Sequence, residues 1–289
     1  MFDQISGNQK RSYALLFLVV LLLAGLVYAI GLYFDMGKWF VAPAVIVALV
    51  MTWSSYYFSD QIVLSMSQAR PATKEEEPYL WNTVEGLSIA AGIPVPRLYI
   101  IEDSAPNAFA TGRNPQHAAI AVTRGLLDKL NRLELEGVIG HEMSHIGNYD
   151  IRFMTLVSVL VGSIVLLSDW MWRVGRYGGR KKGHPILLLI AVVFIILSPI
   201  VAQLMQLALS RQREFLADAT GAKLTRYPEG LASALEKIAA DREPLEVANK
   251  ATAHLYIYNP LRDYKRSFMN NLFTTHPPVV ERVKRLRGM

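Results

Sequence analysis

Long apolar stretches alternate with polar segments along the chain. Four of them approach the length of about 20 residues that a helix needs to cross a bilayer. They are residues 12–34, 39–58, 153–172 and 185–209. The pattern predicts an N-terminal transmembrane hairpin (1–58), a first soluble part (59–152), a second transmembrane hairpin (153–209) and a second soluble part (210–289).

The first soluble part has the pattern of a small α+β fold. Thr73 followed by Glu76 is a capping-box pattern and predicts a helix that ends near Gly92. Helical periodicity returns from Thr123 and continues through HEMSH almost directly into the third apolar stretch. In between, three short apolar runs bounded by Pro, Gly or Asn predict strands at 97–103, 107–112 and 117–123.

The composition agrees with a membrane protein. Apolar residues make up 52% of the chain, the mean hydropathy is +0.24, and charged residues make up only 19%. The absence of cysteine excludes disulfides, thiolate metal sites and cysteine catalysis. The net charge of +6 comes from scattered Lys and Arg, which favours a basic surface beside an anionic leaflet over a nucleic-acid partner.

The segment HEMSH has the spacing of a catalytic zinc site. Residues four apart share one face of a helix, so His141 and His145 can both direct an imidazole at one ion. Glu142 falls beside the open fourth position, where a general base is needed. The alternative is that the histidines merely cap or solvate a helix.

A third ligand must come from elsewhere in the chain. The best candidate is Glu214 in REFLAD, on a helix that follows the fourth apolar stretch. If the third and fourth stretches form an antiparallel hairpin, that helix returns to the side where HEMSH lies. Asp218, one turn later, could accept the other ring N–H of a ligand histidine. The alternative for REFLAD is a charged helix face beside the membrane.

One predicted strand carries a further functional candidate. Asn107, Ala108, Phe109 and Ala110 alternate like an exposed strand, and an edge strand can bind an extended peptide through its backbone. The alternative is an ordinary edge strand that begins at Pro106-Asn107.

HEMSH before a hydrophobic hairpin, then REFLAD, with NAFATG upstream and THPP downstream, resembles the HtpX family of integral-membrane zinc metallopeptidases. These are gluzincins related to the CAAX prenyl proteases. The resemblance implies a membrane α+β protein: four transmembrane helices in two hairpins and a mainly helical zincin-type catalytic domain with a small β-sheet.

The resemblance also implies roles for individual residues. His141, His145 and Glu214 would bind one Zn²⁺ per chain, Glu142 would be the general base, and Asp218 would hold a ligand histidine. The strand from Asn107 to Ala110 would align the substrate, with Asn107 near the zinc. His276 and Arg282 would approach the active site, although a loop histidine and a solvated arginine would give the same pattern. The donor that stabilises the oxyanion would be Asn107, His276 or Arg282.

The function that the resemblance implies is endopeptidase cleavage of misfolded or damaged membrane proteins, or of unfolded polypeptides, at the cytoplasmic face. One alternative is a zinc protease of prenylated peptides, but its relatives need a larger intramembrane chamber than four spans supply. The other is a non-enzymatic scaffold or chaperone with a structural zinc site, which would have no use for Glu142. The pattern predicts no particular oligomeric state.

Charged residues beside the apolar stretches give conflicting indications of topology. Lys10 and Arg11 favour a cytoplasmic N-terminus, which places the catalytic domain at the cytoplasmic face of a bacterial inner membrane. The basic loop 173–184 then falls on the opposite side, against the positive-inside tendency. The tendency is overridden here, or the second hairpin does not fully cross, or the orientation is reversed; we retain a cytoplasmic catalytic domain.

Overall fold

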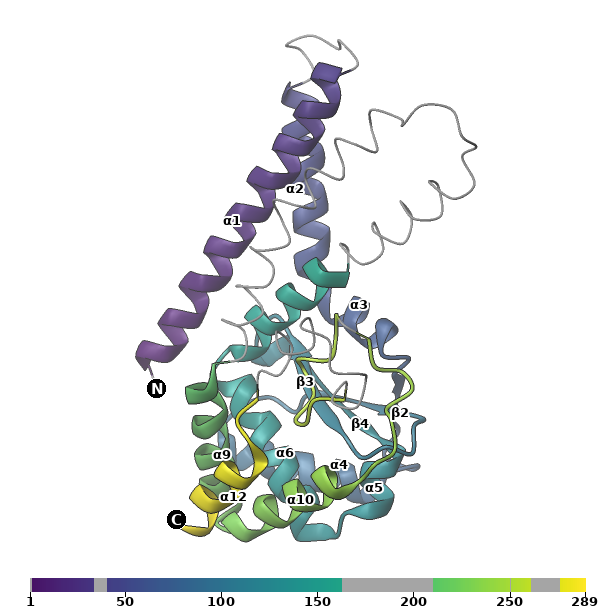
Figure 1. Cartoon of the computed structure of the whole chain (residues 1–289), viewed down its shortest axis with the longest axis vertical. Coiled ribbons are helices and arrows are strands. Elements are labelled where there is room, and N and C mark those ends of the chain that lie inside the picture. The colour runs from purple at the N-terminus through teal and green to yellow at the C-terminus, as the bar shows by residue number, and fades with distance from the viewer. Residues whose placement is uncertain (1, 34–40, 163–209, 250, 261–275) are drawn as a thin grey trace.

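Two long helices project from a rounded body (Figure 1). This is a computed structural model, and it describes residues 2–33, 41–162, 210–249, 251–260 and 276–289. Helices α1 (Phe2–Tyr33) and α2 (Val41–Tyr57) lie side by side as a hairpin. Within the described part of the chain, no helix combines the length and apolar character required for a membrane span. The four predicted spans therefore remain a prediction, and most of the second hairpin lies outside the described residues.

The body contains a four-stranded mixed sheet. Its strands are β1 (Arg70–Pro71), β2 (Arg97–Ile101), β3 (Ala108–Gly112) and β4 (Ala118–Thr123). Their order is β1-β2-β4-β3, with β2 and β4 parallel and the other pairs antiparallel. The three predicted strands are confirmed, whereas β1 is too short for a period-two pattern to have indicated it.

Both faces of the sheet are buried, because side chains alternate between two cores. Ile120 and Val122 of β4 face the core shared with α4 (Pro78–Ala91), α6 (Arg132–Gly147) and α10 (Pro228–Ala240). Ala119 and Ala121 face a second core, to which α3 (Ser59–Met66) and the helical residues 150–162 contribute. The sheet thus sits inside the body.

One predicted helix boundary is corrected. The Glu76 amide donates to Thr73 Oγ1 over 3.2 Å as expected, but α4 begins only at Pro78. The residue before a proline is disfavoured in the helical region, so the first turn does not continue into the helix. Its end at Gly92, with φ 66°, is as predicted.

The HEMSH helix lies where the sequence predicted it. After α5 (Arg124–Lys129), α6 begins with a complete capping box between Asn131 and Glu134. Only residues 148 and 149 separate α6 from the next helix, and Tyr149, with φ 61°, turns the chain there, so the almost direct continuation is confirmed.

Helices α6 and α9 (Arg211–Thr225) pack backbone against backbone, and α12 (Val279–Arg287) closes the body near the C-terminus. A Cβ on Gly221 of α9 would lie only 2.8 Å from the His141 amide nitrogen of α6. This close approach needs glycine, and it brings side chains from the two helices into direct contact.

Candidate metal centre

Three buried side chains from α6 and α9 converge on one point. The Nε2 atoms of His141 and His145 lie 3.2 Å apart. Carboxylate oxygens of Glu214 lie 3.8 Å from His141 Nε2 and 3.6 Å from His145 Nε2. The three residues form a group able to hold a metal ion.

The size of this triangle fits a tetrahedral ion. Zinc with ligands at about 2.0–2.1 Å keeps neighbouring ligand atoms about 3.3 Å apart. Two imidazoles and a carboxylate are also a donor set that zinc accepts, with a fourth position left open. The geometry and chemistry of His141, His145 and Glu214 therefore fit a zinc ion.

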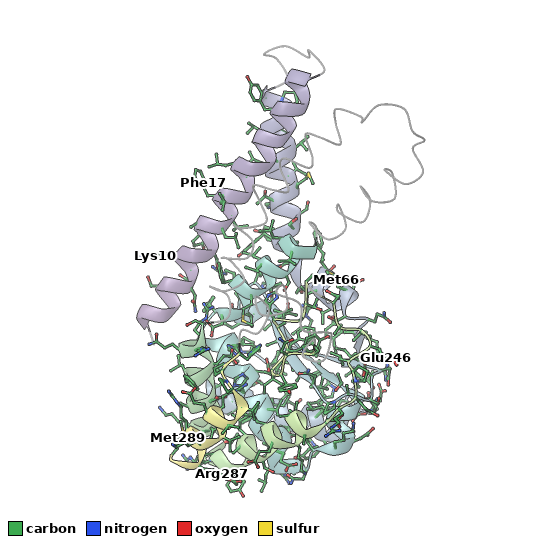
Figure 2. The ribbon with its side chains drawn as sticks, in the orientation of Figure 1. Lys10, Phe17, Met66, Glu246, Arg287 and Met289 are labelled. Carbon is green, nitrogen blue, oxygen red and sulfur yellow. The ribbon has the colours of Figure 1, made fainter. Side chains whose placement is uncertain are left out.

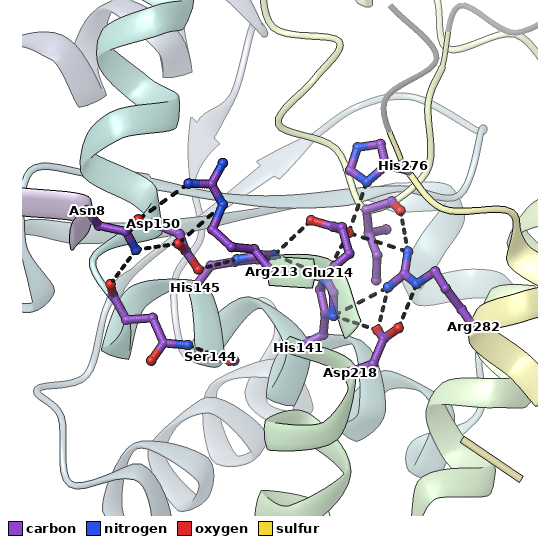
Figure 3. Close-up of polar contacts among 12 residues, drawn as sticks. Asn8, His141, Ser144, His145, Asp150, Arg213, Glu214, Asp218, His276 and Arg282 are labelled. Atoms are coloured by element: carbon purple, nitrogen blue, oxygen red, sulfur yellow. Dashed lines mark hydrogen bonds and ion pairs between the residues drawn. The ribbon is translucent and has the colours of Figure 1, made fainter. Parts of the chain in front are cut away.

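His141 is held from behind by an acid and an arginine. Asp218 Oδ1 lies 3.0 Å from His141 Nδ1, so the ring donates this proton and leaves Nε2 as a ligand atom. Arg282 donates to both Asp218 oxygens, over 2.6 Å and 2.9 Å, and to the Ile257 carbonyl over 3.1 Å (Figure 3). Arg282 thus reaches the site, but its closest contacts are with Asp218 and the backbone.

His145 has a matching acid that the sequence analysis missed. Its Nδ1 lies 3.1 Å from Asp150 Oδ2, and Asp150 is buried. Asp150 follows the turn after α6, so helical spacing from His145 could not place it. The only signal was an acid shortly after HEMSH.

The surroundings set the charge of the three groups before metal binds. Burial lowers the pKa of His141 to about 4, outweighing the bond to Asp218. Burial also opposes charge on His145, but Asp150 and Glu214 raise its pKa to about 9. The pKa of Glu214 is held well below its usual value, against the effect of burial, by His276, His145 and Arg282.

Glu142 is buried beside His145 and Glu214, and one of its oxygens has no hydrogen bond to a described residue. The residue is 1% exposed, and no described residue partners its buried Oε1. Burial raises its pKa to about 7, and the negative charge of Glu214 adds to this, while His145, the Ala110 backbone amide and Arg282 lower the pKa and offset part of the effect. A carboxylate with a pKa near neutrality can both accept and return a proton.

His276 also reaches the centre, just before α12. Its Nδ1 lies 2.9 Å from Glu214 Oε2 (Figure 3). Its buried Nε2 has no partner among the residues that the structure describes. His276 therefore reaches the site through the third candidate ligand.

The expected substrate strand is placed differently. β3 is the sheet's edge strand, yet all five of its residues are buried. The Ile257 amide donates to the Ala108 carbonyl over 2.9 Å, on the side of β3 away from β4. The Asn107 side chain donates to the Tyr258 carbonyl over 2.9 Å. The expectation of an exposed strand was wrong, and Asn107 bonds this neighbouring segment.

Comparisons with known proteins identify the family of the chain. Residues 74–289 match the sequence model of peptidase family M48. The chain belongs to this family. A "Protease HtpX homolog" of Dictyoglomus thermophilum is 49% identical over 100% of this chain and 94% of that protein. Relatives of the same name from Tropheryma whipplei and Listeria monocytogenes are 44% and 41% identical, covering 98% and 100% of those proteins.

The M48 membership confirms the resemblance to HtpX proteases and makes the chain a metalloprotease. The crystal structure of S. mikatae Ste24p is similar over 99% of this chain and 67% of that one, with a TM-score of 0.52. At 19% sequence identity this likeness shows a shared fold alone.

Proposed function

We propose that the chain is a zinc-dependent endopeptidase with its active site at HEMSH. The observation that carries this is the buried triangle of His141, His145 and Glu214, beside which lies Glu142, whose Oε1 has no partner among the described residues. A structural site would be closed by a fourth ligand, whereas the proposed site has three ligands and a neighbouring carboxylate suited to proton transfer.

Bound zinc would supply Lewis-acid activation of a water molecule and of the scissile carbonyl. Glu142 accepts the proton of the attacking water and delivers it to the leaving amine. His276, which contacts Glu214 through its Nδ1, would stabilise negative charge on the tetrahedral oxyanion. Asp218 fixes the His141 ring, and Arg282 holds Asp218 and adds positive charge beside Glu214, at 3.7 Å.

An extended substrate would bind along β3, between Asn107 and Ala110. The Ala110 amide lies beside Glu142, so this stretch of backbone runs past the proposed base. Backbone pairing with the edge of β3 is the expected mode of binding. A substrate that pairs with the Ala108 carbonyl replaces the bond that Ile257 now makes.

The proposed location is a bacterial inner membrane, with the catalytic body cytoplasmic and misfolded membrane proteins as substrates. Large apolar side chains on the hairpin are exposed, among them Phe17 at 65%, which projects from α1 (Figure 2). Trp53 and Tyr57, exposed near the body end of α2, suit the membrane–water interface. Such a location favours substrates held at the bilayer surface.

Cleavage and metal content measured together test the proposed reaction. The substrate is an unfolded membrane protein in detergent, and the proteins are wild type, Glu142→Gln and Glu214→Ala. Glu142→Gln should keep one zinc and lose cleavage, whereas Glu214→Ala should lose both. If Glu142→Gln cleaves as fast as wild type, HEMSH is not the catalytic centre.

The substrate class needs a separate comparison. Wild-type enzyme is given unmodified membrane proteins and a prenylated peptide at equal concentration. We expect cleavage of the unmodified proteins. Exclusive cleavage of the prenylated peptide would favour the alternative activity.

A further inference from the structure

The start of α1 contacts the surroundings of the metal centre, although it is more than 130 residues away in the sequence. Asn8 is buried, and its Nδ2 donates to Asp150 Oδ1 over 2.7 Å and to the Asn148 carbonyl over 3.0 Å. Its Oδ1 accepts from Arg213 Nη1 at 3.4 Å. All the hydrogen-bonding groups of this amide are therefore used (Figure 3).

The acid that Asn8 contacts is the one that orients a ligand. One Asp150 oxygen accepts from Asn8, while the other faces His145 Nδ1. The ring nitrogen that remains is Nε2, which lies in the ligand triangle. The position of the His145 ring therefore depends on where Asp150 is held.

Asp150 is the first residue of the helix that follows α6. It comes directly after a turn in which Tyr149 lies in the left-handed region, with φ 61°. Asn8 bridges the two ends of this turn, the Asn148 carbonyl and the Asp150 carboxylate. Arg213 adds a charge contact at 3.7 Å from Asp150.

We propose that Asn8 is a positioning residue of the metal centre, acting through Asp150 on His145. It links the N-terminal helix α1 to the geometry of a metal ligand. The helix that we propose to be a membrane anchor thus forms part of the support of the active site. This inference rests on the proposed zinc site.

Metal affinity measured by competition with a chelator tests the proposal. The variants are Asn8→Ala and the near-isosteric Asn8→Leu, which keeps the packing volume but cannot hydrogen-bond. Loss of an outer partner of a metal ligand costs about 10- to 100-fold in affinity. We expect both variants to bind zinc about tenfold more weakly, at the low end of this range. The control is Gln9→Ala, a half-buried amide on the same helix with no hydrogen bond to any described residue.

Two further readouts separate positioning from general destabilisation. In the cobalt-substituted protein, Asn8→Leu should alter the visible absorption bands that report ligand geometry, and Gln9→Ala should not. If Asn8 acts through Asp150, adding Asn8→Ala to Asp150→Ala should weaken zinc binding no further.

Three outcomes would overturn the inference. They are zinc affinities of both Asn8 variants within twofold of wild type, unchanged cobalt spectra, or fully additive losses with Asp150→Ala. If wild type itself holds no zinc, the proposed function fails as well, so the two failures can be told apart.

Discussion

At the scale of single residues, Glu134 shows how the helix that carries HEMSH is anchored. Its carboxylate accepts the Asn131 amide, Lys237 Nζ over 2.8 Å and Ser233 Oγ over 2.6 Å. Burial raises its pKa, but these bonds outweigh burial and lower the pKa below its usual value. One acid thus caps α6 and ties it to α10.

We predict that Glu134→Gln destabilises the protein at neutral pH by about 1 kcal/mol, a modest value because Lys237 is half-exposed. A carboxylate with a depressed folded-state pKa stabilises above its unfolded pKa of about 4.3, and this is lost as pH falls through the folded pKa. The difference in unfolding free energy between variant and wild type should stay constant from pH 8 to 5 and shrink at lower pH. A difference that grows on acidification contradicts this assignment.

Most residues of the site could be predicted, because they lie close together in the sequence within recognisable motifs. His141 and His145 share a helix face, and Glu214 and Asp218 share another, so spacing alone groups each pair. Asp150 and Asn8 could not be predicted in the same way. Their contacts depend on a turn after α6 and on the docking of α1, which no short-range pattern encodes.

At the scale of elements, the close approach of α6 and α9 decides whether the two histidines of α6 meet Glu214 of α9. Their contact relies on Gly221, where a side chain would press on the His141 backbone. The sequence predicted both helices but not this contact, because a helical glycine can be buried or exposed. The covering of β3 by Ile257 was missed for a related reason: it joins segments far apart in the sequence.

We predict that Gly221→Ala forces α9 away from α6. Such overpacking costs about 1–3 kcal/mol, and zinc binding should weaken because Glu214 moves from the two histidines. The matched control is Gly86→Ala, on the exposed face of α4 with no atom within 4 Å of the new Cβ. It should stabilise the protein by about 0.5–1 kcal/mol. Thermal unfolding and zinc content are measured for both, and a Gly221→Ala protein with full zinc affinity would disprove the role of this contact.

At the scale of the whole molecule, the hairpin and the body constrain each other. The start of α1 contacts the turn after α6 through Asn8, so the N-terminal end lies on the same side as the metal centre. A hairpin that crosses the membrane twice returns the chain to that side. The contact therefore favours a two-span hairpin, and it leaves the second hairpin to be determined.

The topology of the second hairpin can be measured by cysteine labelling, because the chain contains no cysteine of its own. We introduce one cysteine at a time, Glu246→Cys on the exposed surface of the body or Gly178→Cys in the basic loop, and label intact spheroplasts with a membrane-impermeant maleimide. A cytoplasmic body with a crossing second hairpin predicts labelling of position 178 before permeabilisation and of position 246 only after it. If both positions need permeabilisation, the second hairpin does not cross and the basic loop obeys the positive-inside tendency. If only position 246 reacts in intact cells, the body faces outward and the proposed cytoplasmic substrates are wrong.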